Sequence, residues 1–249
     1  MDEDSAATRF NEPEAGPTWR ERARLDPLGA VLDPSDQQGT KNQLIDRVHK
    51  RVLARAAGSV SGATVLDFGC GTGRLSEWFV NRGASVDGVD VTPEMVAVAA
   101  ARVPSARFQT IDGITLPFEQ AHFDCVVSVA VLQYYVGGDM PMTRELARVL
   151  RPGGQLLAIE QVAASELGRG GPIGAYEKML VGAGLQILDA SVVRLGDSRI
   201  IALGQRFPRL ARLPIVPWLV TTEARARASA PLTEGRYADA FLCATKAAH

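Results

Sequence analysis

The sequence contains few of the residues that form disulfides or hold metal ions. Its only cysteines are Cys70, Cys125 and Cys243, an odd number without any C-x-x-C spacing. Disulfide frameworks and zinc sites both depend on paired or closely spaced cysteines, so we expect neither of them and no metal site. A chain without disulfides is suited to a reducing compartment, and we therefore expect a cytoplasmic protein.

Long apolar runs and an excess of charge of either sign are also absent. No stretch approaches the roughly 20 apolar residues that cross a bilayer, and the acidic start MDEDSAATRFNEPEAG lacks the basic and apolar parts of a secretory signal. The 27 basic and 28 acidic residues give a net charge of -1, which provides no general attraction for nucleic acid. We expect no nucleic-acid partner and no transmembrane segment, while peripheral contact with a membrane stays open.

Hydrophobic residues make up 46% of the 249 residues, which is enough for one packed core. Ahead of that core, residues 1–40 are rich in proline and charge and predict a flexible or loosely docked arm. Residues 41–57, KNQLIDRVHKRVLARAA, place apolar side chains at helical spacing and predict an amphipathic helix that caps the core. We therefore divide the chain into an arm with a capping helix at 1–57 and a main domain at 58–249.

From residue 64 onward, apolar strand-like segments alternate with helical patterns, and YADAFLCAT forms the last strand-like segment. This alternation is typical of βαβ units and predicts an α/β fold with a doubly wound, mostly parallel sheet. A long connection at 196–235 precedes the last strand, and its segment RFPRLARLPIVPWLV, residues 206–220, is basic and apolar with three prolines. We predict that 196–235 is a lid over a substrate site. A dimer contact and a strap packed on the core are the alternatives.

The densest chemical signal is VLDFGCGTG at 65–73, where an apolar strand runs into glycines at alternate positions and then into a helix. Glycine lets the backbone turn sharply and approach a ligand closely, although such a turn also serves tight packing. The spacing differs from that of dinucleotide-binding loops, and the lysine of phosphate-binding loops is absent. Asp67 stands just before the glycines, where its carboxylate can bind a ligand ammonium group or steady the loop.

Polar side chains also end the next three predicted strands. Asp90 can accept hydrogen bonds from both hydroxyls of a ribose, or it can cap the following helix, a role that Thr92 can also fill. Asp112 can bind the amine of an adenine or belong to an ordinary turn. The fourth strand ends in Gln133 and Tyr134. Because ligands bind outside the carboxyl ends of parallel strands, these residues together predict one nucleoside-binding edge.

Four segments, in this order, resemble the class I, seven-stranded S-adenosylmethionine-dependent methyltransferases of type 11. VLDFGCGTG resembles the first motif of that family, GVDVTPEM its ribose-binding strand end, IDGITLPF its adenine-contact segment, and ELARVLRPGGQLLAIE its helix, turn and fifth strand. The resemblance covers about residues 60–195 and implies S-adenosylmethionine as the cofactor. It also implies strand order 3-2-1-4-5-7-6, with YADAFLCAT as the antiparallel seventh strand after the insertion at 196–235.

The family pattern further implies a set of cofactor contacts. The methionine end lies along the glycine-rich loop, Asp90 holds the ribose, Met95 packs near the adenine and Asp112 meets its amine. The implied cofactor residues are Asp67, Gly69, Gly71, Thr72, Gly73, Asp90, Val91, Met95, Asp112, Gly113 and Val129.

The family pattern gives no histidine base here, because many relatives carry histidine after the fourth strand where this chain has VLQYY. Glu160, at the tip of the fifth strand, is the best-placed general-base candidate, and Tyr134 can position the acceptor. Either residue can instead act from behind the site. We predict that Gln133, Tyr134 and Glu160 face the substrate. The histidines are expected in solvated or structural roles: His49, His122 and His249.

These patterns predict a methyltransferase that moves a methyl group from S-adenosylmethionine to a small-molecule or lipid-like acceptor, at oxygen or nitrogen. The sequence identifies neither that acceptor nor the oligomeric state. The sulfonium already activates the methyl group, so aligning the acceptor is the main task of the protein. A non-catalytic nucleoside-binding or regulatory module on the same fold is the alternative. An NAD-dependent oxidoreductase is disfavoured by the spacing of the loop.

Overall fold

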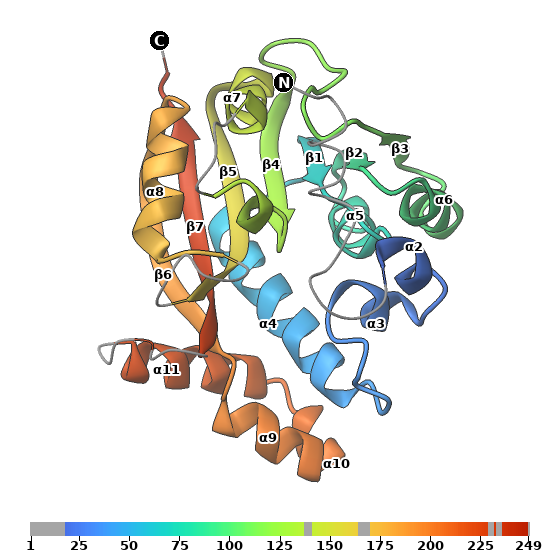
Figure 1. Cartoon of the computed structure of the whole chain (residues 1–249), viewed down its shortest axis with the longest axis vertical. Helices are drawn as coiled ribbons and strands as arrows, with labels where there is room; N and C mark the ends of the chain where they lie inside the picture. Colours follow the sequence, from blue (N-terminus) through green and yellow to red (C-terminus); the bar gives the residue numbers. More distant parts are fainter. Residues whose placement is uncertain (1–17, 137–140, 164–169, 229–231, 233–235, 249) are drawn as a thin grey trace.

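The computed structural model describes residues 18–136, 141–163, 170–228, 232 and 236–248, and these contain one seven-stranded sheet flanked by helices (Figure 1). The strand order is β3-β2-β1-β4-β5-β7-β6, and β7 runs antiparallel to β5 and β6. This confirms the fold class and the strand order that the family resemblance implies. The strands are β1 (Thr64–Phe68), β2 (Ser85–Asp90), β3 (Arg107–Thr110), β4 (Phe123–Val129), β5 (Leu150–Ala163), β6 (Leu185–Leu195) and β7 (Tyr237–Lys246).

Helices cover both faces of the sheet because its central strands are apolar on both sides. Neighbouring residues of a strand point to opposite faces, so Val65 and Val127 pack with α5 (Arg74–Val80) and the end of α4 (Thr40–Ala57). Leu66 and Val126 pack on the other face with α7 (Pro141–Val149) and α8 (Ile173–Gly182). Helix α6 (Pro93–Arg102) lies along β2 and β3. The amphipathic helix predicted from the sequence corresponds to α4.

The chain that precedes α4 forms two short helices, α2 (Trp19–Arg22) and α3 (Pro27–Val31), which lie between α4 and α6 (Figure 1). Both begin with a side-chain cap, which supplies partners for free N–H groups of the first turn. Thr18 and Glu21 form a reciprocal capping box at α2. The Asp26 carboxylate accepts hydrogen bonds from two N–H groups at the start of α3. These caps explain why a polar, proline-containing sequence adopts helices here.

The expectation of a flexible or loosely docked arm at 1–40 is wrong for the part that the structure describes. The Arg22 side chain is buried and donates a hydrogen bond to the Leu32 carbonyl at 3.0 Å. The Thr72 hydroxyl, in the glycine-rich loop, donates to the Pro27 carbonyl at 3.0 Å. The polar groups that suggested solvent exposure are therefore used in caps and in contacts with the main domain. The first 17 residues lie outside the described part of the chain.

The long connection before β7 is helical, with α9 (Arg199–Arg206), α10 (Pro208–Ala211) and α11 (Val216–Arg227) packed against α4 and β6. Pro208 and Pro217 lie in the first turns of α10 and α11, where proline leaves no intrahelical N–H unpaired. The prolines therefore begin helices here and do not break them. Residues 229–231 and 233–235 of the predicted lid lie outside the described residues. No helix in the described ranges is long and apolar enough to cross a membrane.

The carboxyl ends of the parallel strands meet at one edge of the sheet, because each crossover helix returns the chain to the same end. In the parallel pairing of β1 with β2, Asp67 lies beside Gly88. The N–H groups of Gly69 and Cys70 both donate to the Val89 carbonyl, at 2.8 and 2.9 Å. These bonds hold the glycine-rich loop against the tip of β2. Most of the residues predicted from the sequence gather along this edge.

Candidate functional site

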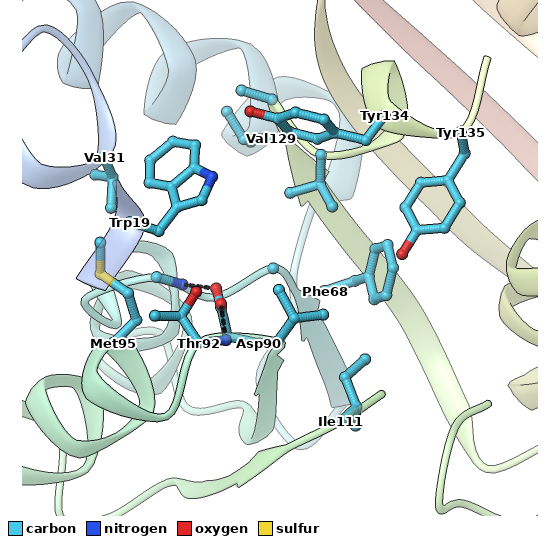
Figure 2. A pocket seen from close by; sticks show the side chains of 15 residues that line it. Trp19, Val31, Phe68, Asp90, Thr92, Met95, Ile111, Val129, Tyr134 and Tyr135 are labelled. Atoms are coloured by element: carbon cyan, nitrogen blue, oxygen red, sulfur yellow. Dashed lines mark hydrogen bonds between the residues drawn. The ribbon is translucent and has the colours of Figure 1, made fainter. Parts of the chain in front are cut away.

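A cavity opens at the carboxyl ends of β1, β2 and β4, between the sheet and α2 (Figure 2). This strand-tip cavity contains about 670 Å³ of space, part of it open to solvent, which is within the usual range for small-molecule sites. Among the described residues that line it, Asp90 alone carries a charge. The lining residues are Trp19, Val31, Phe68, Gly69, Gly71, Asp90, Val91, Thr92, Met95, Ile111, Val129, Ala130, Val131, Tyr134 and Tyr135.

Gly69 and Gly71 bring the backbone of the loop to the surface of this cavity. Their φ angles of +71° and +50° lie in the left-handed region that favours glycine. A Cβ atom on Gly69 would overlap the side chain of Val131, and one on Gly71 would lie 2.6 Å from Cγ1 of Val31. Both positions therefore require glycine for conformation and for space. The result is a stretch of backbone that lines the cavity at two positions without side chains.

Asp90 ends β2 with its carboxylate between the loop and the start of α6. Its Oδ2 accepts a hydrogen bond from the Gly71 N–H and its Oδ1 one from the Thr92 N–H, both at 2.9 Å (Figure 2). Burial raises the pKa of Asp90, and these hydrogen bonds oppose the rise. Each carboxylate oxygen keeps another acceptor position, so two vicinal hydroxyls can still bind. The Thr92 side chain makes no capping hydrogen bond, which leaves Asp90 to order this turn.

Three implied cofactor residues, Asp67, Thr72 and Gly73, hold the loop in place and do not line the cavity. The buried Asp67 carboxylate accepts a hydrogen bond from the Ser76 hydroxyl at 2.6 Å, and burial raises its pKa to about 6. This contact favours the loop-steadying alternative for Asp67. Thr72 ties the loop to α3. Gly73 precedes α5 with a φ of +74° and packs against Ala99.

Asp112 and Gly113 lie in a turn after β3 and also fall outside the cavity lining. The Asp112 carboxylate accepts hydrogen bonds from the N–H groups of Ile114 and Thr115, at 2.8 and 2.9 Å. Against the effect of burial, these bonds lower the pKa of Asp112. The Gly113 carbonyl accepts a hydrogen bond from the Tyr135 hydroxyl at 3.2 Å. Asp112 thus has the contacts of an ordinary turn aspartate, and its contact with adenine stays a prediction.

The remaining implied cofactor residues, Val91, Met95 and Val129, do line the strand-tip cavity. The interpretation of the sequence missed Trp19 and Val31, which α2 and α3 place across the cavity from the strand tips (Figure 2). One signal was available, because TWRE follows the capping-box pattern that marks a helix start. That pattern predicts order around the tryptophan, although it does not predict where the helix docks.

Glu160 lies behind the turn that follows β4 and includes the short 3-10 helix η1 (Leu132–Tyr134). Its buried carboxylate accepts hydrogen bonds from the Ser128 hydroxyl and from the N–H groups of Val131 and Gln133, at 3.1, 3.3 and 3.2 Å. Burial raises the pKa of Glu160 to about 7. Glu160 lines neither this cavity nor the next one. These contacts favour the alternative in which it acts from behind the site, by shaping the turn.

A second cavity, the adjoining cavity, lies on the side of α4 and contains about 960 Å³ of space, part of it open to solvent. The two cavities share four lining residues, Trp19, Val31, Val129 and Ala130, which we call the shared wall. The other walls of the adjoining cavity come from the N-terminal segment, α4 and the neighbouring ends of β5, β6 and β7. Its charged and polar lining residues are Arg22, Asp33, Lys41, His49, Gln133, Gln161, Arg194, Tyr237 and Asp239.

Tyr134 and Gln133, predicted to face the substrate, belong to different cavities. Tyr134 lines the strand-tip cavity and Gln133 the adjoining one. The Tyr134 hydroxyl and the Gln133 Oε1 are buried, and neither has a hydrogen-bond partner among the residues the structure describes. Buried polar groups are usually paired. Both groups are therefore available to a ligand, and their roles stay predictions.

The histidines have different surroundings. His49 is buried in the wall of the adjoining cavity, with its Nε2 3.2 Å from Asp239 Oδ2. The sequence predicts only a solvated or structural role for it, and that prediction does not include its position in a cavity wall. His122 precedes β4 at the opposite edge of the sheet and stacks on Phe118. His249 lies outside the described residues. Within the described ranges, no group of His, Cys, Asp or Glu is arranged to hold a metal ion.

The predicted lid segment 206–220 contributes no residue to either cavity. Ala211, Val216 and Val220 pack with apolar residues of α4 and α9. Five other large apolar side chains are exposed to solvent: Phe207, Leu210, Leu213, Ile215 and Trp218. The expectation that the apolar part of this segment faces the mouth of the site is wrong, because α4 separates it from the strand tips. The cover over the strand tips comes from α2 and α3.

Comparison with known proteins agrees with this geometry. Residues 65–154 match the family described as "Methyltransferase domain". Methyltransferase GfsG from Streptomyces halstedii is 32% identical over 156 residues, which make up 60% of this chain and 51% of GfsG. The fatty-acid O-methyltransferase from Mycolicibacterium smegmatis is 28% identical over 231 residues, which make up 89% of this chain and 80% of that enzyme.

Solved structures agree on the fold. The crystal structure of the [4+2]-cyclase SpnF has a TM-score of 0.60 and 23% sequence identity, over 84% of both chains. The chain spans about half the length of GfsG, the first curated relative that it matches. The matched residues begin in β1, just before the glycine-rich loop, and reach the start of β5. This match and the order of the sheet agree: residues 65–154 match a methyltransferase domain, and the sheet has the strand order of the class I S-adenosylmethionine-dependent methyltransferase fold.

Proposed function

We propose that this protein transfers the methyl group of S-adenosylmethionine to an oxygen atom of a small-molecule or lipid-like acceptor. The observation that carries the proposal is the shared wall between the two cavities. A donor bound in the strand-tip cavity and an acceptor bound in the adjoining cavity would meet there. Such an arrangement supports group transfer between two bound molecules, because it fixes their proximity and orientation.

The strand-tip cavity fits S-adenosylmethionine in its chemistry. Asp90 offers carboxylate oxygens to the two ribose hydroxyls, and Met95 offers an apolar surface to the adenine. The backbone of Gly69 and Gly71 lines the cavity, and we place the amino-acid part of the cofactor along it. When bound, the cofactor supplies a methyl group that its sulfonium has already activated. The protein then has to bind it, orient it and exclude water from the shared wall.

Two relatives support methyl transfer, and one of them supports an acceptor of this kind. GfsG is named a methyltransferase, and the second relative, aligned with 89% of this chain, is named a fatty-acid O-methyltransferase. The adjoining cavity has apolar residues, such as Ile45 and Ile159, beside its charged groups. A mixed lining of this type suits an amphiphilic molecule with an apolar body and a polar end. We therefore propose oxygen as the atom that receives the methyl group.

The alternative is a member of the family that binds the cofactor without transferring its methyl group. The fold is also found in SpnF, which is a [4+2]-cyclase, and one fold can host several chemistries. The test combines calorimetry with a methyl-labelled cofactor. We expect S-adenosylmethionine to bind to the wild type and label to pass to a component of a metabolite extract. Tight binding without transfer to any component would favour the binding module.

We also propose which segment of the chain covers the two cavities. The α2–α3 segment supplies Trp19 and Val31 to both cavities, and it is tied to the glycine-rich loop through Thr72. We assign this segment, and not residues 196–235, as the cover of the site. The helices of the later connection serve instead to brace α4 against β6.

A further inference from the structure

We propose that His49, oriented by Asp239, is the general base that removes a proton from a neutral hydroxyl of the acceptor. The inference rests on the proposed methyl transfer and specifies its acceptor as a hydroxyl compound, in preference to a carboxylate. His49 and Asp239 are 190 positions apart in the sequence and meet in the wall of the adjoining cavity.

The geometry fixes which imidazole nitrogen is free. His49 Nε2 lies 3.2 Å from Asp239 Oδ2, and an ionised carboxylate can only accept hydrogen bonds. Nε2 therefore carries the proton and donates it, which leaves the lone pair on Nδ1. This Nδ1 is buried and has no hydrogen-bond partner in the described part of the chain. A base needs just such a free lone pair next to the bound acceptor.

Asp239 is itself held in a fixed orientation and kept ionised. Arg194 donates to it through two nitrogens, with Nε 2.6 Å from Oδ2 and Nη2 2.8 Å from Oδ1. Although burial opposes it, the Arg194 guanidinium and the contact with His49 hold the pKa of Asp239 well below its usual range. All three side chains are at least 94% buried. The carboxylate can therefore stabilise the imidazolium that forms when His49 takes a proton.

Burial, with a smaller effect of two arginines, favours the neutral form of the His49 imidazole. Burial lowers the pKa of His49 below its ordinary value of 6.5, and Asp239 opposes this shift. Arg194 from β6 and Arg74 from α5 lower the pKa further, and Arg74 is paired with Asp46 of α4 at 2.7 Å. The same cavity is also lined by Arg22 and by the Lys41–Asp33 ion pair. A neutral imidazole at neutral pH is the form that accepts a proton.

The unpartnered groups of this cavity define the chemistry of the ligand that fits them. His49 Nδ1 and Gln133 Oε1 are both acceptors, and both are buried without a partner. Nη1 of Arg194, a donor, is also buried without a partner among the described residues of this lining. A complementary ligand must therefore bring both a donor and an acceptor, and a hydroxyl group supplies both. A carboxylate brings only acceptors, so it would satisfy Arg194 Nη1 but leave His49 Nδ1 and Gln133 Oε1 unsatisfied. It also has no proton to lose, so its methylation would not need His49.

The proton and electron pairs balance in one step. The O–H bond of the acceptor breaks and its proton passes to His49 Nδ1, while an oxygen lone pair forms the new bond to the methyl carbon. The carbon–sulfur bond of the sulfonium breaks, and its electron pair stays on sulfur. The products are a methyl ether, S-adenosylhomocysteine and a His49 imidazolium paired with Asp239. The imidazolium then releases its proton to solvent.

The first test needs no acceptor. The histidine nitrogens of the wild-type protein with bound S-adenosylmethionine are titrated by NMR, with His122 as the internal comparison. We expect His49 to be neutral at pH 7 with the proton on Nε2, and its titration to move to lower pH in Asp239→Asn, which removes the neighbouring negative charge. An imidazolium at pH 7, or a neutral ring with the proton on Nδ1, would overturn the assignment.

The second test follows labelled methyl transfer to a metabolite extract, to a long-chain alcohol, to a phenol and to a long-chain fatty acid. His49→Gln should lose about 10²- to 10⁴-fold in kcat toward hydroxyl acceptors and keep its affinity for the cofactor. The matched variant His122→Gln should keep both. For the wild type, kcat/KM should fall as the pH drops through the pKa of His49. Transfer to carboxylates alone, or full activity of His49→Gln, would overturn the inference. A wild type that binds the cofactor without any transfer would instead overturn the proposed function.

Discussion

Replacing Asp90 by alanine tests the cofactor site at its only charged position within the described lining. In the proposed complex, its carboxylate binds the two ribose hydroxyls. A hydrogen bond to a charged group contributes about 1.5 to 3 kcal/mol, so two of them contribute about 3 to 6 kcal/mol. The lower end applies here, because burial already raises the pKa of Asp90 and disfavours the charged form. A loss of about 3 kcal/mol weakens binding roughly 100-fold.

The assay is isothermal titration calorimetry with S-adenosylmethionine and with S-adenosylhomocysteine. The variant also loses the bonds from Asp90 to the Gly71 and Thr92 N–H groups, so its thermal unfolding is measured without ligand as well. Asp124→Ala is the matched control, since this carboxylate also accepts a hydrogen bond from a backbone N–H group, that of Thr64, but lies outside the cavity. A folded Asp90→Ala protein that binds within threefold of wild type would refute the ribose assignment.

Three further predictions concern the walls and the support of the site. Gly71→Val should abolish cofactor binding in calorimetry while circular dichroism stays native, because the new side chain would collide with Val31; normal binding would show that the loop is not the cofactor cradle. Trp19→Ala should weaken both cofactor binding and transfer, since the indole lines both cavities, and an effect on neither would remove α2 from the site. Burial raises the pKa of Glu160 to about 7 from its ordinary 4.5, so its contribution to stability is present in acid and lost as the pH rises to 7. The Tm of Glu160→Gln relative to wild type should therefore rise between pH 4.5 and 7, and a constant difference would contradict the burial of this carboxyl.

Local patterns in the sequence predict the sheet and the cofactor edge well. The periodicity of 41–57 predicts α4, and the alternation of strands and helices with the four motifs leads to the observed strand order. The position of Asp90 at the end of β2 follows from the strand pattern alone. These features depend on neighbours in the sequence, because helix periodicity, strand ends and glycine-rich turns are all local.

The features that the sequence does not predict arise from contacts between distant segments. The pair of His49 and Asp239 forms only when α4 packs over β7. Trp19 reaches the cavity because α2 docks against α6, a contact without any local pattern. The prolines of 206–220 suggested an irregular lid, yet two of them occupy first turns of helices. In each case, tertiary packing determines the conformation or contact, and the local sequence does not distinguish it from its alternatives.

The placement of Trp19 and Val31 in both cavities has a consequence for the kinetics of the protein. Ligands in the two cavities would lie against this segment, which contacts the main domain through, among others, the hydrogen bond between Thr72 and Pro27 and a surface ion pair between α2 and α6. Opening such a segment requires much less free energy than global unfolding. Where release of the spent cofactor requires α2 and α3 to move, the turnover number reports this motion and not the chemical step. Solvent viscosity should therefore slow turnover, while the residence time of S-adenosylhomocysteine should shorten when the contacts of this segment are weakened.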